Sequence, residues 1–208
     1  MSLIIAFVGG TEAAIVADMR EITFQGDKVL RERLERKLYR GAIATDIELE
    51  KMAEEIGVKI KIRDNKIKVM QRYGALVGEV VSVEDGFVRK RRLYVTAGSY
   101  MIAETRDSEV KVTNKGGSAF IVLGNNITKE IANKCIRENW KNGGFHEAIK
   151  VLILSMEAAA KVSASVSKKF IIIQTSSNVN LSEVIEQDKI GRKNLPWCSS
   201  VYAFGGYD

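Results

Sequence analysis

Two short apolar runs joined by a glycine turn open the chain and limit its fold more than any other feature. Residues 2–8 and 12–18 are rich in aliphatic and β-branched side chains, and Gly9-Gly10-Thr11 separates them. This is the pattern of a strand, a tight turn and a second strand. Apolar residues fill both alternating faces of the first run, as in a strand that is covered on both sides. The opening of the chain therefore predicts a hairpin at the centre of a layered sheet structure.

Heavily charged helical patterns follow the hairpin. The spacing predicts a helix over residues 27–40, and Thr45-Asp46-Ile47-Glu48 is a capping box that opens a second helix. Residues 58–63 and 66–71 alternate polar and apolar side chains around the turn-forming pair Asp64-Asn65, which predicts an exposed hairpin. We interpret the segment at about 27–74 as an insertion that carries these two helices and this hairpin.

The rest of the chain reads as a run of strands followed by helices. The expected strands are 75–84, 87–96, 99–105, 109–113, 118–124 and 170–175, and the expected helices are 128–139, 146–161 and 181–190. Strands and helices in this order are typical of an α+β protein with helices packed against stacked antiparallel sheets. We expect residues 1–208 to form a single domain that includes the insertion.

The composition excludes several classes of protein. The longest apolar runs are far shorter than the ~20 residues that span a bilayer, and the N-terminus lacks the basic start of a secretory signal. We therefore expect a cytoplasmic protein without membrane insertion. His146 is the one histidine, which argues against most zinc sites and against a Ser-His-Asp triad, and two cysteines do not make a disulfide framework. We expect neither a metal nor a cofactor.

The net charge gives a second, non-enzymatic interpretation. The formal charge of +6 is spread over 32 basic and 26 acidic residues, which is typical of a solvated surface. The basic run at residues 88–92 would suit a nucleic-acid-binding module, although an edge strand guarded by charge is the commoner explanation. We keep that module as an alternative, and we do not expect nucleic acid to be the partner.

Ser2 is the candidate nucleophile. A serine hydroxyl needs a base, and a serine that becomes the N-terminus after removal of Met1 carries its own α-amine, with a pKa of about 8. A chain that keeps Met1 should be inactive. If the hairpin turns through three residues centred on Gly10, Ser2 lies opposite Asp18, whereas a two-residue turn shifts the pairing by one.

The residues around this serine resemble the start of a proteasome β subunit, an N-terminal-nucleophile (Ntn) hydrolase. There a nucleophile, a turn and an Ala-Asp-x-Arg segment follow at the spacing of residues 2–8 and 14–20. The resemblance implies a four-layer αββα sandwich. It also gives Asp18 the place of the buried acid that orients the active-site charges, and Arg20 the place of the arginine beside it.

Two downstream segments extend the resemblance. Residues 120–126, followed by a helix, are similar to the segment where proteasome subunits carry Gly-Ser-Gly, which implies that Asn125 replaces an active-site serine. The family also has an Asp and a Ser after the next helix. Here Ser163, Ser165 and Ser167 follow that helix, and Ser163 would replace the Asp.

The family's active-site lysine has no clear counterpart. Lys28 is the nearest by position, while Lys37 or a basic residue returning from a later strand fits equally well.

The insertion and the runs at residues 41–46 and 91–98 resemble the connectases, proteasome-like protein ligases of methanogenic archaea. That resemblance implies an enzyme that cleaves a Lys-Asp-Pro-Gly-Ala-type motif in a methyltransferase subunit of methanogenesis. It would hold the acyl part as an ester on Ser2 and transfer it to an incoming N-terminal amine. A peptidase or amidase that passes the same ester to water is the alternative. The insertion either grips the peptide or covers the sheet, and we expect a monomer.

Overall fold

The computed structural model describes residues 3–84, 87–106 and 109–194. Its central sheet is antiparallel and has the strand order β10-β1-β2-β11. These strands are β1 (Ile4–Val8), β2 (Ala13–Asp18), β10 (Ala119–Leu123) and β11 (Phe170–Thr175). Every residue of β1 and β2 is buried, so the expected central hairpin is confirmed.

The register of this hairpin differs by one residue from the three-residue-turn prediction. Gly9 N–H donates to the Glu12 carbonyl at 2.8 Å, which leaves a two-residue turn, and Ile4 pairs with Ala17. Asp18 N–H donates to the Leu3 carbonyl at 3.1 Å. Leu3 therefore takes the position opposite Asp18, and the pairing of Ser2 with Asp18 is wrong. The apolar pattern fixes which face is buried, but the turn geometry decides the register.

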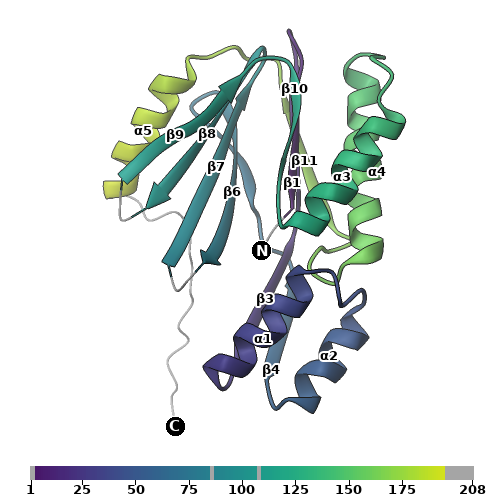
Figure 1. Cartoon of the computed structure of the whole chain (residues 1–208). Coiled ribbons are helices and arrows are strands. Elements are labelled where there is room, and N and C mark those ends of the chain that lie inside the picture. Colours follow the sequence, from purple (N-terminus) through teal and green to yellow (C-terminus); the bar gives the residue numbers. More distant parts are fainter. Residues whose placement is uncertain (1–2, 85–86, 107–108, 195–208) are drawn as a thin grey trace.

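Both faces of the central sheet are covered (Figure 1). Helices α3 (Asn126–Asn139) and α4 (Phe145–Val162) pack on the face that carries Leu3, Ile5 and Phe7. A five-stranded antiparallel sheet packs on the other face, in the order β5-β6-β7-β8-β9. Its strands are β5 (Val69–Arg72), β6 (Ala75–Glu84), β7 (Phe87–Thr96), β8 (Ser99–Arg106) and β9 (Glu109–Gly116). Helix α5 (Leu181–Asn194) covers the outer face of that sheet. The protein is therefore an α+β fold with antiparallel sheets.

Residues 20–64 form a separate hydrophobic cluster, here called the small lobe. It contains β3 (Arg20–Gln25), α1 (Lys28–Tyr39), α2 (Asp46–Glu55) and β4 (Lys59–Asp64). The two helices and the capping box of α2 were expected. The exposed hairpin over 58–71 is wrong, because β4 pairs with β3 while β5 pairs with β6. The alternation of β4 instead turns Ile60 and Ile62 toward the core of the lobe.

A buried carboxylate holds α5 on the outer sheet. Asp188 is fully buried and accepts hydrogen bonds from Arg72 at 2.9 Å, from Tyr94 at 2.6 Å and from Arg92. Burial, followed by the bond to Asp188, raises the pKa of Tyr94 to about 12. Removing the charge of Asp188 would leave the positive charges of Arg72 and Arg92 without this buried carboxylate, which is costly inside a protein.

We expect Asp188→Asn to lower the free energy of unfolding by about 3 kcal/mol, measured by denaturant titration. The matched control is Glu186→Gln on the same helix, whose side chain is exposed and pairs with Lys189. Its loss should stay below about 0.5 kcal/mol. Equal losses in the two variants would contradict the anchoring role of Asp188.

Candidate active site

The carboxylate of Asp18 lies at the centre of a buried polar cluster at the end of β2. It is fully buried and accepts hydrogen bonds from Leu3 N–H at 2.7 Å, from Arg20 N–H at 2.8 Å and from the Lys68 ammonium at 2.8 Å. The candidate nucleophile Ser2 lies outside the described residues. The residue that follows it in the chain, Leu3, is fixed to Asp18 through its backbone.

Lys68 supplies the positive charge beside Asp18. It lies between β4 and β5, and its side chain is 3% exposed. Burial lowers the pKa of the Lys68 ammonium below its ordinary value, and the Asp18 carboxylate opposes that shift. Lys28 lies elsewhere: it is exposed at the start of α1, with its ammonium 4.0 Å from Glu32. Of the three alternatives for a lysine near the candidate acid, which were Lys28, Lys37 and a basic residue from later in the chain, the structure places the last beside Asp18.

Residues 163–167, here called the serine loop, connect α4 toward β11. The hydroxyls of Ser163 and Ser165 lie 2.7 Å apart, and the Asn125 amide donates to Ser165 Oγ at 3.3 Å. Asn125 also caps α3, because its Oδ1 accepts from Thr128 N–H at 2.8 Å. The structure therefore brings Asn125 and Ser163 into one buried network with Ser165.

Ser167 links the serine loop to the end of β2. Its hydroxyl accepts from Met19 N–H at 3.0 Å and donates to the Lys169 carbonyl. Met19 follows Asp18 directly, so the serine loop and the candidate acid are joined through one residue.

Arg20 uses all five of its guanidinium N–H groups. Two of these groups donate to the Asp64 carboxylate, both at 2.9 Å. Two more donate to the two oxygens of Asp46, one of them at 3.0 Å. The fifth donates to the Ala164 carbonyl at 2.8 Å. Burial alone would lower the pKa of Arg20, but the bonds to Asp64 and Asp46 outweigh it and hold the pKa above its ordinary value. The same Arg20 contact lowers the pKa of Asp64. In the sequence, Asp46 stood in the capping box of the second helix and Asp64 in a turn-forming pair, and neither pattern pointed to Arg20.

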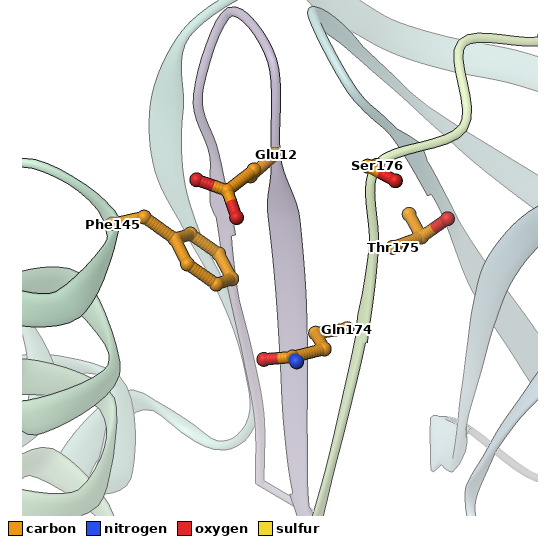
Figure 2. A pocket seen from close by; sticks show the side chains of 5 residues that line it. All are labelled: Glu12, Phe145, Gln174, Thr175 and Ser176. Carbon is orange, nitrogen blue, oxygen red and sulfur yellow. The ribbon is translucent and has the colours of Figure 1, made fainter.

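A shallow pocket of about 330 Å³ lies at the opposite end of β2. Figure 2 shows Gln174, Thr175 and Ser176 along one segment, with Glu12 and Phe145 coming from two other elements. Among the described residues, Glu12 is its one acidic lining residue, and Thr175 and Ser176 add hydroxyl groups, but no lysine, arginine or histidine lines it. Across residues 3–84, 87–106 and 109–194 there is no cluster of three metal-ligating side chains, and no helix long and apolar enough to cross a membrane. Asp18 is therefore the better candidate centre.

The chain matches a known family over nearly all of its length. The family model described as "Connectase MJ0548-like, N-terminal domain" matches residues 1–190. A solved structure that resembles this one is an Anbu mutant from Hyphomicrobium sp. strain MC1. Its identity is 8%, its TM-score is 0.39, and the match covers 93% of this chain and 100% of that one. No curated protein matches. The resemblance to connectases is confirmed, and the chain belongs to the connectase N-terminal-domain family.

Proposed function

We propose that this protein is an N-terminal-nucleophile protein ligase, with Ser2 as nucleophile after removal of Met1. The observation that carries the proposal is the buried Asp18–Lys68 pair, bonded at 2.7 Å to the amide of the residue after Ser2. A buried charged pair at the start of the first strand supports this proposal, because such pairs cluster at functional sites and can tune the proton affinity of an adjacent nucleophile and base. The α+β layers described above are, in this proposal, the αββα sandwich of an Ntn hydrolase.

The reaction divides into two acyl transfers. Ser2 Oγ attacks the scissile carbonyl carbon, and its proton passes to the α-amine of the same residue. The amine then protonates the leaving nitrogen, which departs with the C-terminal fragment and leaves an ester on Oγ. An incoming α-amine attacks that ester, a new peptide bond forms, and Oγ recovers a proton.

Asp18 and Lys68 have different tasks in this scheme. The Lys68 charge favours the neutral form of the nearby α-amine, because a second positive charge at short range is unfavourable. The amine can then accept a proton at neutral pH. Asp18 holds both the lysine and the Leu3 amide, and so fixes the geometry of the strand start.

Membership of the connectase family favours ligation over hydrolysis. In this proposal the substrate is an exposed Lys-Asp-Pro-Gly-Ala-type segment of a methyltransferase subunit. The peptidase or amidase alternative uses the same ester. The nucleic-acid alternative has less support, because Arg89 binds Glu104 at 2.6 Å and Arg92 is buried against Glu79 and Asp188.

Intact-mass measurement tests the proposal. We expect the purified chain to lack Met1 and, after mixing with a peptide that contains Lys-Asp-Pro-Gly-Ala, to gain the mass of the acyl fragment. A labelled peptide with a free N-terminal amine should then give a ligated product. Free acid as the sole product would favour the hydrolase alternative, and an active chain that keeps Met1 would rule out Ser2 as nucleophile.

A further inference from the structure

One residue of the serine loop is built into the small lobe. Ala164 is 2% exposed and belongs to the hydrophobic cluster of the lobe, together with Leu34, Leu38 and Ile43. Its N–H donates to the Ile43 carbonyl at 3.1 Å, and its carbonyl accepts from Arg20 at 2.8 Å. Residues of the lobe therefore contact the backbone N–H, the backbone carbonyl and the methyl group of Ala164.

Ala164 lies in a part of the chain that has few backbone hydrogen bonds of its own. Residues 163–169 lie between α4 and β11 without regular secondary structure, and the one backbone bond within them runs from Val166 N–H to the Ser163 carbonyl at 3.2 Å. Ala164 stands between Ser163 and Ser165, whose hydroxyls bond each other. Fixing Ala164 therefore constrains the backbone that carries both serines, while Asn125 holds the Ser165 hydroxyl.

Arg20 links Ala164 to the candidate acid, Asp18. Its guanidinium is held by Asp46 at the start of α2 and by Asp64 at the end of β4, while its backbone N–H donates to Asp18. Both carboxylates hold the planar guanidinium in the orientation in which it donates to the Ala164 carbonyl. Neither Asp46 nor Asp64 donates or accepts a hydrogen bond with Asp18. Asp64 also interacts electrostatically with Lys68, so Asp46, which bonds Arg20, is the carboxylate that tests the route through Arg20 alone.

We propose that the small lobe is a positioning device for the reaction: Asp46 and Asp64 orient Arg20, which clamps Ala164 and so sets the serine loop beside Asp18. The kinetic part of this inference rests on the proposed function at Ser2. The lobe thus determines the catalytic rate, in addition to whatever it contributes to covering the sheet or binding a peptide.

The test compares Asp46→Asn, Asp64→Asn and the double variant with Glu50→Gln, an exposed carboxylate on the same helix as Asp46. Hydrogen exchange of the amides at 163–167 should rise about tenfold in the double variant and stay unchanged in Glu50→Gln. The rate constant kcat for ligation of the Lys-Asp-Pro-Gly-Ala peptide should fall about tenfold, with KM constant within about twofold. Asp46→Glu keeps a carboxylate at this position, so its kcat should lie between that of Asp46→Asn and that of the wild type.

Each outcome separates this inference from the proposed function. Unchanged exchange at 163–167 in variants that melt cooperatively overturns the clamp. Faster exchange with an unchanged kcat, or a raised KM alone, overturns the positioning role and leaves Ser2 untouched. A wild-type chain that forms no ester overturns the proposed function and the kinetic role together, even where the exchange result holds. If the double variant fails to fold, Asp46→Asn decides, because its carboxylate is 47% exposed and its loss is the milder change.

Discussion

Ser2→Ala should lower the rates of both cleavage and ligation by about 10⁴-fold or more, because nothing replaces the attacking hydroxyl. Alanine is small enough to permit removal of Met1, so the α-amine remains in this variant. The loss would then report the hydroxyl alone. The measurement is the initial rate with the Lys-Asp-Pro-Gly-Ala peptide, together with the intact mass, which should show no acyl adduct.

Two controls make this result specific. Ser2→Thr keeps a hydroxyl and should still form the adduct, more slowly. Ser182→Ala removes an exposed serine at the start of α5 and should keep the wild-type rate. All three variants should unfold within about 0.5 kcal/mol of the wild type, because no core side chain is changed. Cleavage by Ser2→Ala at the wild-type rate would remove Ser2 from the mechanism.

Local sequence patterns predicted the parts of the fold that depend on neighbouring residues. The buried hairpin, the capping box at Thr45 and the main helices each follow from side chains within a few positions of one another, and each is present. Asp18 was singled out differently, by its place opposite Ser2 in a three-residue-turn register and by the Ala-Asp-x-Arg resemblance, and it ends β2 at the side away from the hairpin turn. Its burial and its three donors are consistent with the role that the resemblance gave it.

The features that the sequence did not predict depend on contacts between distant segments. Lys68 is fifty positions from Asp18, and no motif marks it, so the sequence named Lys28 as the nearest by position and left Lys37 and a later basic residue open. The alternating pattern of β4 revealed a strand but not its partner, which is β3. The same limit applies to Ala164, whose neighbours Ile43 and Arg20 come from the other end of the chain.

Lys68→Met should have the second largest effect, a loss of about 10²- to 10³-fold in kcat at neutral pH. The sign of the pH effect follows from the charge. In the proposed mechanism the α-amine of Ser2 accepts a proton in its neutral form, so activity should rise as the pH passes the pKa of that amine. The Lys68 ammonium would lower this pKa in that mechanism, and its removal should shift the rise by about one unit toward higher pH.

The two lysines offer a matched comparison. Lys28→Met changes the lysine that sequence position favoured, whose side chain is 77% exposed, and it should leave both the rate and the pH profile unchanged. A Lys68→Met enzyme with the wild-type profile, or a loss of activity confined to Lys28→Met, would place the essential charge elsewhere.

Stability and activity should separate when both members of the buried pair are replaced. Lys68→Met leaves the Asp18 carboxylate buried without its cation, and we expect the free energy of unfolding to fall by about 3 kcal/mol. Adding Asp18→Asn removes the uncompensated charge, so the double variant should regain much of that loss in denaturant titrations, because an uncharged pair has little desolvation cost. Its activity should stay as low as that of Lys68→Met, because the cation that the proposed mechanism requires is still missing. A double variant that recovers both would mean that the pair serves the fold alone.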